Sequence, residues 1–561
     1  MTNEYRKDMK NIKQYGNWLM VVCLTLVIVV SCKKDSDELS LKRQFSPSLV
    51  TSKNGETSVE LTWAASLFTI SGDVEYVVEV SPDPAFGAVE YSVTTPNLTT
   101  TISDDKLTIK KDYYARIKAV GKNGATDSNW LVSSAFRITG EQFLIAINST
   151  TVTDVAVQLT WRLNPDLNKL VFTPPVGAPV EYTLTAGEKA AGLKVITGLT
   201  QSTTYSAEIF QDTKSKGLIS FKTKASITGN IVDLTGTTGD PNALITALGT
   251  AASGSIIVLR RGETYKFTSF TFTGGKSVSI VTALGFGTDY AIIRSTGSFT
   301  IAASTTTDSL VFRDLIIKGQ NVATAPLSYD NHYLFNVGNT NVNVTKMRFD
   351  NCNIRILRGL VRGQAGTPAS PVTNPPTVPS LVVTNYIINN CVMDSIREYG
   401  IASTFNTSGS SFKNITVTNS TFSHFRKFID HRVYGNLSIN ISNCTFFDVV
   451  AGAAAPANAF IDFQTVGAGI VNISNCIFGR TWNETGAGTL VWGFRASTGS
   501  PGGAGSYGTS DFVNDNLPIS VTSYAGTSLS LFTDPVNDNF KIKDVTFVGR
   551  SIAGDPRWRI N

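Results

Sequence analysis

The chain has 561 residues, and at roughly 100 to 200 residues per domain this length excludes a protein with a single core. Hydrophobic residues make up 42% and charged residues 16%, so the chain is not disordered, and it has fewer charges than the ~25% of an average soluble protein. The net charge is +5, part of which lies in residues 1–31, and the rest gives no electrostatic argument for a nucleic-acid ligand.

Residues 1–31 are predicted to be a signal peptide. After the basic residues that end at Lys13, the apolar run Trp18–Val30 has 13 residues, which is short of the roughly 18 that a membrane-spanning helix needs. Ser31 before Cys32 resembles a bacterial lipobox. The resemblance implies that Cys32 receives a lipid, which anchors the chain in the outer membrane, facing the cell exterior. Residues 32–43 then form a tether whose acidic cluster is similar to the surface-export tag of Bacteroidetes lipoproteins.

The remaining chain is predicted to be all-β, because Thr, Ser, Asn, Gly and Val are abundant and helix-forming stretches are few. SVELTW (58–63) and AVQLTW (156–161) end in tryptophans 98 residues apart, and each is followed by a Leu and, six residues later, a Tyr. A buried Trp and a Tyr that fixes a corner through its hydroxyl suit a two-sheet sandwich. The pattern resembles tandem fibronectin type III domains at residues 44–140 and 141–225, which implies a spacing or protein-contact role.

Residues 226–561 are predicted to form a right-handed parallel β-helix that resembles pectate lyases. A short helix at Pro241–Leu248 is expected to cap its entrance. Five later segments share Asn, then Cys or Ser, then any residue, then a large apolar residue. These segments are NCNI (351–354), NCVM (390–393), NSTF (419–422), NCTF (443–446) and NCIF (475–478).

Equivalent positions on stacked parallel strands lie about 4.8 Å apart. The fourth position of the motif therefore predicts a buried apolar stack, and the first predicts a hydrogen-bonded Asn ladder at a turn. The second position is Cys in all segments but one, where it is Ser420. A row of thiols does not provide the tetrahedral geometry of zinc, so we expect inert, buried cysteines.

Two rows of polar residues are predicted on the outside of the coils. Six residues after the second motif position lie Arg358, Arg397 and Arg426, followed by Val450 and Trp482. The second row is expected where LVRGQ (360–364), FIDHR (428–432), FIDFQ (460–464) and LVWGF (490–494) align, with Ile401 on the coil in between. This second row would bring together Arg362, Asp430, Asp462 and Trp492.

The first functional hypothesis is that the β-helix binds an acidic polysaccharide, such as a pectic glycan. Arginine forks pair with carboxylates, and stacked coils repeat them at regular spacing. The candidate glycan-binding residues are Arg358, Arg362, Arg397, Arg426, Arg432, Trp482 and Trp492. The alternative from the residues themselves is a charge ladder in which Arg and Asp side chains neutralise one another.

A calcium-assisted polysaccharide lyase is the second hypothesis, and a purely structural or adhesive protein is the third. FIDH resembles the WIDH segment of pectate lyases, although the downstream Arg-x-Pro-x-x-Arg pattern is missing. In a lyase, Lys427, Arg432 or His431 would take the catalytic role, and Asp430 with Asp462 would hold calcium. A binding protein needs no such cofactor.

The whole mature chain, closing in GRSIAGDPRW (549–558), resembles Bacteroidetes surface lipoproteins. In these proteins, fibronectin type III domains precede a pectate-lyase-like β-helix made of domains of unknown function. The resemblance implies a role in polysaccharide utilisation beside glycan-import proteins. It supplies no catalytic motif, so the candidate site residues depend on the register above.

Overall fold

The computed structural model describes residues 42–560 except 71, 320–331, 365–379, 405–409, 432–436, 451–457, 464–468, 483–490, 497–498, 500 and 514–516. The predicted lipidation of Cys32 and the predicted roles of Arg432 lie outside the described residues. In the part of the chain that is described, no helix combines the length and the hydropathy needed to cross a bilayer.

The first sandwich has two antiparallel sheets around one core. One sheet contains β1 (Ser48–Asn54), β2 (Ser58–Ala64) and β5 (Thr99–Ser103). The other contains β4 (Tyr91–Thr95), β3 (Tyr76–Ser81), β6 (Tyr114–Ala119) and β7 (Leu131–Val132). Trp63 and Tyr113 are both buried in this core. The Tyr113 hydroxyl accepts a hydrogen bond from the Thr108 backbone N–H at 3.1 Å, which is the corner contact predicted from the sequence.

The second sandwich repeats this plan with an added helix. One sheet contains, in spatial order, β10 (Val180–Thr183), β9 (Lys169–Thr173), β12 (Thr204–Gln211) and β13 (Lys214–Lys222). The other pairs β11 (Leu193–Thr197) with β8 (Ala156–Thr160). Helix α2 (Ala186–Ala191) begins after Thr185, which forms a capping box with Glu188. Trp161 and Tyr205 are buried, as expected, and Tyr205 stacks on Phe172.

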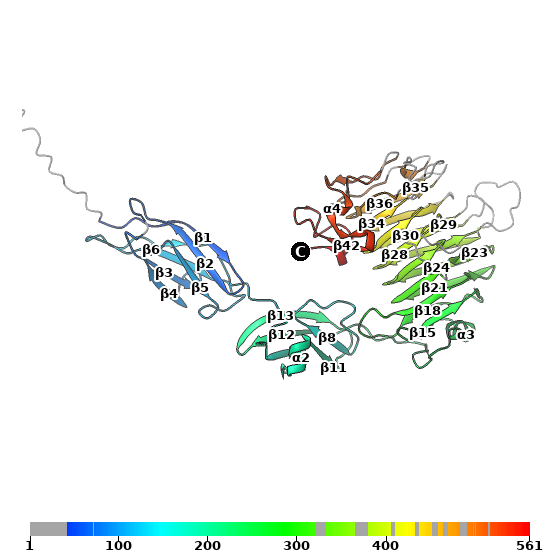
Figure 1. Ribbon diagram of the computed structural model, residues 1–561, viewed down its shortest axis with the longest axis horizontal. Helices are drawn as coiled ribbons and strands as arrows, with labels where there is room; N and C mark the ends of the chain where they lie inside the picture. Colours follow the sequence, from blue (N-terminus) through cyan, green and yellow to red (C-terminus); the bar gives the residue numbers. More distant parts are fainter. Residues whose placement is uncertain are drawn as a thin grey trace, which may run out of the picture. The chain divides into compact units, whose positions relative to one another are not determined.

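The following segment is a parallel β-helix, as predicted, with three parallel sheets that follow one another in each coil (Figure 1). The first sheet is β14 (Ile231–Asp233), β15 (Ser255–Leu259), β18 (Val278–Thr282), β21 (Thr305–Arg313), β24 (Val342–Asp350), β27 (Leu381–Asn389), β30 (Ser411–Thr418), β33 (Ser438–Ser442) and β36 (Ile470–Ser474). The second sheet is β16 (Thr264–Phe267), β19 (Ala291–Ser295), β22 (Leu315–Gly319), β25 (Asn353–Leu357), β28 (Val392–Ile396), β31 (Thr421–Phe425), β34 (Thr445–Val449), β37 (Ile477–Phe478), β39 (Tyr507–Gly508) and β40 (Thr522–Ser523). The third sheet is β17 (Phe270–Phe272), β20 (Phe299–Ile301), β23 (Tyr333–Val337), β26 (Gly359–Gly363), β29 (Ala402–Thr404), β32 (Ile429–His431), β35 (Asn458–Asp462) and β38 (Val491–Arg495).

The predicted apolar stack is confirmed. Ile354, Met393, Phe422, Phe446 and Phe478 pair in register from β25 to β37 and are all buried. The last three rings stack with centroids 5.2 and 4.9 Å apart. The four cysteines of the motif are free and buried, and burial raises the pKa of the Cys352 thiol well above its ordinary value. These thiols therefore behave as small apolar residues.

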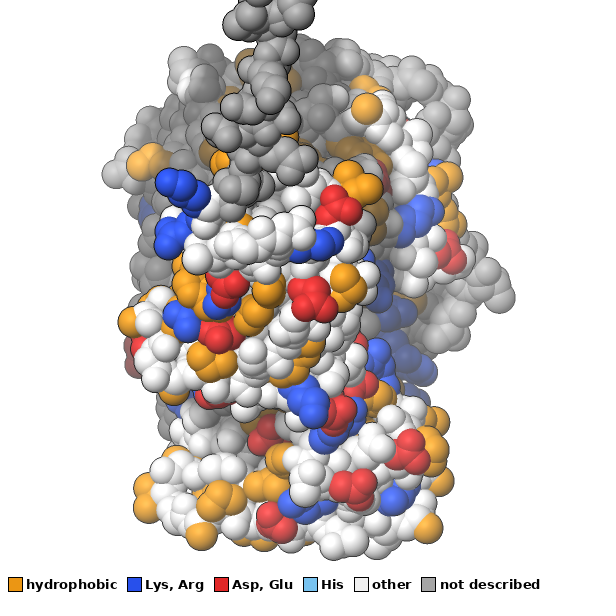
Figure 2. All heavy atoms as spheres, turned by 90° about the vertical axis from the view of Figure 1, so that its left-hand side faces the viewer, with side chains coloured by type: hydrophobic (Ala, Val, Ile, Leu, Met, Phe, Trp, Pro, Cys, Tyr) orange, Lys and Arg blue, Asp and Glu red, His pale blue; other side chains and the backbone are white. Residues whose placement is uncertain are grey.

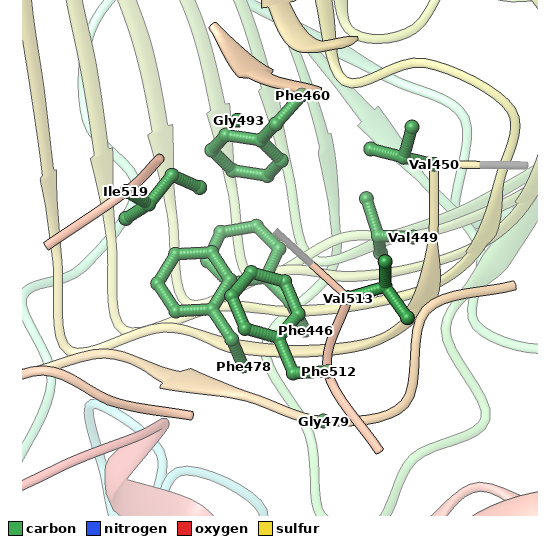
Figure 3. A pocket seen from close by; sticks show the side chains of 10 residues that line it. All are labelled: Phe446, Val449, Val450, Phe460, Phe478, Gly479, Gly493, Phe512, Val513 and Ile519. Atoms are coloured by element: carbon green, nitrogen blue, oxygen red, sulfur yellow. The ribbon is translucent and has the colours of Figure 1, made fainter. Parts of the chain in front are cut away.

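Apolar side chains also fill the two ends of this core. Helix α3 (Ala243–Thr250), close to its predicted position, packs Leu244 and Leu248 against the first coils. In the last coils, Phe446, Phe460 and Phe478 point into a cavity of about 10 Å³ (Figure 3). A space of this size is at the lower limit for one water molecule, so this cavity does not serve as a ligand site.

The motif asparagines share a left-handed backbone conformation, with φ between 52° and 55°. The residues are Asn351, Asn390, Asn419, Asn443 and Asn475. Asn390 donates from its side-chain amide to Asn351 Oδ1 at 3.0 Å, and each backbone N–H donates to the next coil. Asn tolerates this conformation better than other non-glycine residues, which explains its recurrence at the turn.

Replacing Asn443 by alanine is expected to lower the free energy of unfolding by about 1–2 kcal/mol, because alanine has the same crowded Cβ at positive φ but lacks the short polar side chain that offsets this crowding through local hydrogen bonds. Asn443→Gly keeps the conformation and loses only the contact of Asn443 Oδ1 with Arg559 at 3.0 Å, so it should cost less. Urea unfolding followed by circular dichroism measures both. An alanine variant as stable as the wild type would contradict this account of the ladder.

The C-terminal segment folds back over the outer face of the second sheet. It contains α4 (Ser528–Leu531), β41 (Phe532–Asp534), the 3₁₀ turns η1 (Pro535–Asn537) and η2 (Pro556–Trp558), and β42 (Asn539–Ile542). Phe532 and Phe540 pack on Phe447 and Ile477, which face away from the main core. Figure 1 shows this red segment beside strands β28 and β34.

We call residues 554–559 the strap, because they bind successive coils. Their partners are Asn475 through the Gly554 N–H, Thr445 and Thr421 through Asp555, Thr421 again through Trp558, Asn390 and Asn419 through Arg557, and Asn443 through Arg559. The strap therefore covers the row where the motif asparagines end and the second sheet begins.

Candidate functional site

The outer face of the second sheet carries more side chains than a regular strand allows. Ile356, Ser395, His424 and Asp448 lie at equivalent positions of β25, β28, β31 and β34, and each has a positive φ of 51° to 61°. In each of these strands two consecutive side chains, rather than one, separate the buried positions, and because all four strands share this feature their pairing stays in register.

One polar cluster gathers around His424, which is 8% exposed. Its Nδ1 lies 2.7 Å from Asp394 Oδ1, and its Nε2 lies 3.6 Å from Asp448 Oδ2. Burial alone would lower the pKa of His424, but the hydrogen bond and the charge of Asp394, with the charges of Asp448 and Asp538, raise it. Arg480 in turn binds Asp448 through two nitrogens, at 2.7 and 2.6 Å.

Asp538, from the C-terminal segment, completes this cluster. Its Oδ1 accepts a hydrogen bond from Ser423 at 3.2 Å, and Ser423 also lies 3.1 Å from Asp394. Burial and the neighbouring Asp394 charge raise the pKa of Asp538. Oxygen and nitrogen atoms of Asp394, His424 and Asp538 lie within 4.8 Å of one another, a spacing compatible with a metal ion. The Nδ1 atom of His424 is nevertheless already bonded to Asp394, so this nitrogen is engaged within the cluster.

A row of four cations lies on the same face, which we call the cation column. Lys266, Arg294, Lys318 and Arg355 pair in register on β16, β19, β22 and β25. The pKa of Lys318 is lowered, mainly by burial and to a smaller extent by the charges of Arg294 and Arg355. The Arg355 Nε donates to Asn353 Oδ1 at 3.0 Å, and among the described residues no salt bridge joins a column cation to a carboxylate.

Sequence reasoning missed the cation column because its first three members precede the first Asn-Cys motif. A signal was present, since each cation directly follows a buried residue that faces the core. These buried residues are Tyr265, Ile293, Ile317 and Ile354. An alternation of apolar and basic residues, repeated at coil spacing, indicates a charged row on the outer face.

The predicted arginine row is in register, but its charges are largely paired. Leu357, Ile396 and Phe425 pair on β25, β28 and β31, so the arginine that follows each lies on a neighbouring coil. These arginines are Arg358, Arg397 and Arg426. Arg358 Nη2 and Arg397 Nε bind the two oxygens of Glu398 at 2.8 and 3.2 Å. Two interpretations of this row followed from the sequence, glycan binding and mutual neutralisation by acidic side chains. The contacts of Arg358 and Arg397 correspond to neutralisation.

Arg362 belongs to an aromatic cluster next to this row. Its Nη1 donates to the Tyr333 hydroxyl at 3.0 Å, and its guanidinium carbon lies 4.6 Å from the Tyr399 ring centroid. Arg358 approaches the same two rings, at 5.8 and 5.0 Å. These cation–π contacts hold the arginines in place.

The predicted second row differs from the structure in two coils. Arg362 pairs with Ser403 rather than Ile401, because the turn between β28 and β29 contains two more residues than the alignment allowed. The row continues through Asp430 and Asp462, as expected, but it ends on Arg495, three residues beyond Trp492. Trp492 pairs instead with Ala459.

The residues predicted for calcium and lyase chemistry form a buried ion cluster. Asp462 is fully buried; it accepts from Lys427 Nζ at 2.8 Å and from Arg495 Nε at 2.7 Å, and Arg495 Nη2 binds its second oxygen. Asp430 Oδ1 lies 3.8 Å from Lys427. Burial opposes ionisation, but Arg495 and Lys427 lower the pKa of Asp462. Two protein cations thus occupy the position that calcium would take.

His431 and Trp482 are also in enclosed positions. His431 is 2% exposed, and its Nε2 accepts a hydrogen bond from the Phe412 N–H at 3.2 Å. The ring faces the core, and this burial lowers the pKa of His431 to about 4. The ring is therefore neutral at pH 7. Trp482 is 6% exposed, and its ring lies edge-on to His424, so it does not offer a flat face to a sugar.

Parts of the chain are similar to known proteins. Residues 439–558 match the model of a family described as a domain of unknown function (DUF5123). Among solved structures, the chain is similar to the chicken CNTN1 FN1–FN3 domains, with 14% identity, 33% of this chain and 69% of that chain covered, and a TM-score of 0.16. It is also similar to a two-domain fibronectin type III segment of chicken tenascin, with 16% identity, 31% and 97% coverage, and a TM-score of 0.18. No curated protein matches the chain.

Proposed function

We propose that the β-helix binds an acidic polysaccharide along the cation column. The observation that carries this proposal is the column itself, with Lys266, Arg294, Lys318 and Arg355 stacked in register on four neighbouring strands. Like charges opposite one another on a sheet are destabilising, and at about 4.8 Å per strand these cations repel each other. A polymer with regularly spaced carboxylates relieves this repulsion through repeated charge-assisted hydrogen bonds.

The cation column differs from other charged residues of the chain, many of which form salt bridges. Figure 2 shows the side of the molecule that lies on the left in Figure 1, on which acidic and basic side chains are interspersed among uncharged groups. A row of four like-charged residues that form no salt bridge with any described carboxylate therefore differs from these pairs. This contrast favours the cation column over the paired Arg358 and Arg397 as the glycan contact.

A lyase has less support from the geometry. A catalytic base needs access to the substrate and a position from which it can take a proton, whereas Lys427 is bound to Asp462 and His431 faces the core. We therefore propose binding without cleavage. We also propose that a lipid on Cys32 holds the protein on the outer membrane beside glycan-import proteins, a proposal supported by Ser31, Cys32 and the preceding apolar run.

Native affinity electrophoresis in gels containing polygalacturonate tests the binding. Replacing Lys318 and Arg355 together by glutamine is expected to reduce the retardation and to raise the Kd derived from it at least tenfold. The reason is that a hydrogen bond to a charged group contributes about 1.5–3 kcal/mol. Lys346→Gln is the matched control, because Lys346 is exposed on the first sheet, away from the column. Retardation only by neutral polymers, or an equal loss in the control, would overturn the proposal.

A further inference from the structure

The sign of the charge reverses along the cation column. After Arg355 on β25, the next residue in register is Asp394 on β28, and then Ser423 on β31. Asp538, from the C-terminal segment, lies beside Ser423, so two carboxylates adjoin the end of the column. A polyanion that lies on the cations meets electrostatic repulsion as soon as it passes Arg355.

The same end is closed by packing. On β34 and β37, Phe447 and Ile477 face outward and are buried under Leu531, Phe532 and Phe540 of the C-terminal segment. The segment thus covers the outer face of the second sheet beyond the column. The opposite end is different, because β16 is the first strand of this sheet and Lys266 is exposed.

The carboxylates at the closed end also provide a specific contact. The last sugar of a chain carries a free hydroxyl where an internal sugar carries a glycosidic oxygen, and only the hydroxyl donates a hydrogen bond. Asp538 accepts from Ser423 through Oδ1, and its carboxylate retains further acceptor capacity, since an ionised carboxylate has about four lone-pair sites. Asp394, held by His424 and Ser423, offers a second acceptor.

We infer that the cation column, if it binds an acidic glycan as proposed above, binds the end of the chain rather than its middle. The terminal sugar lies at Arg355 with its free hydroxyl toward Asp394 and Asp538. The following sugars run past Lys318 and Arg294 toward Lys266. The column spans three strand spacings, about 14 Å, and four cations match about four acidic sugars.

Titration calorimetry of the full chain with oligogalacturonates of two to twelve residues tests this inference. Affinity is expected to rise up to a length of about four and then to stay constant. With polymers of increasing length, the amount of protein bound per polymer chain is expected to remain constant. Protein bound in proportion to polymer length would overturn end recognition and leave acidic-glycan binding intact, whereas no binding of any oligomer would overturn the proposed function itself.

Two matched variants define the direction of the chain. Arg355→Gln is expected to weaken the dimer and the tetramer alike, by about tenfold, because both contain the terminal sugar. Lys266→Gln, at the open end, is expected to weaken the tetramer about tenfold more than the dimer. Equal effects of the two variants on both ligands would show that short chains bind anywhere along the column, which contradicts end recognition. Circular dichroism of each variant confirms that it is folded.

Discussion

Replacing Asp462 by leucine is expected to destabilise the β-helix by about 3–5 kcal/mol, which is the cost of breaking a buried ion pair from one side. Asp462 has no exposed surface and binds both Lys427 and Arg495. Its removal leaves two cations in a poorly solvated position without the carboxylate that balances them. The leucine itself cannot repay this loss, because the penalty comes from the charges that remain.

Urea unfolding followed by circular dichroism measures this effect. Asp289→Leu is the matched control, because Asp289 also binds an arginine, Arg261, but its side chain is 62% exposed. An exposed pair of this kind contributes at most about 1 kcal/mol. If the two variants lose the same free energy of unfolding, burial does not determine the strength of the Asp462 cluster and the interpretation is wrong.

Lowering the pH from 7 to 4 is expected to cost the β-helix about 3 kcal/mol through His431 alone. Burial lowers the pKa of this histidine to about 4, whereas the unfolded chain titrates near 6.5. A lowered folded-state pKa gives a stabilising contribution that is fully present above pH 6.5 and is lost as the pH falls through 4. The physical reason is that a proton on the ring would bury a charge within the core.

His431→Gln removes the titration and supplies an amide oxygen that can accept from the Phe412 N–H in place of Nε2. The variant should be less sensitive to acid than the wild type, by about 3 kcal/mol between pH 7 and pH 4. His424→Gln should change the acid response in the opposite direction, because the pKa of His424 is raised and its contribution is present at low pH and lost as the pH rises. Parallel pH profiles for the wild type and the His431 variant would contradict the assignment.

The sequence was sufficient to predict which residues of the β-helix pair with one another wherever the Asn-Cys motif recurs. The large apolar residue of each Asn-Cys motif faces the core, and a shift of one residue would turn it to the solvent side. This constraint explains why the stack from Ile354 to Phe478 and the arginine row six residues later are in register. Further along each coil, turn lengths vary without changing the core, and the predicted row therefore departed from the structure at Ile401 and Trp492.

Burial on the outer face was not predictable in the same way. Charged residues such as Lys427, Asp430 and Asp462 are the types expected at an exposed site. The repeat correctly placed Asp430 and Asp462 on neighbouring strands. Their enclosure depends on parts of the chain distant in sequence, and a periodic pattern holds no information on that packing. Conversely, Lys266, Arg294 and Lys318 lie upstream of the first cysteine motif, where the sequence repeats no Asn-Cys marker, although the strand register continues there.

The strap has a consequence for how the solenoid loses its structure. In an array where each repeat contacts only its neighbours, the terminal repeat can fray while the others remain intact. Residues 554–559 bind coils that contain Asn390, Thr421, Asn443 and Asn475, so each of these coils is tied to the others through the strap as well as through its neighbours. The final coils therefore melt as one cooperative block, and their apolar interior stays closed until the whole block opens.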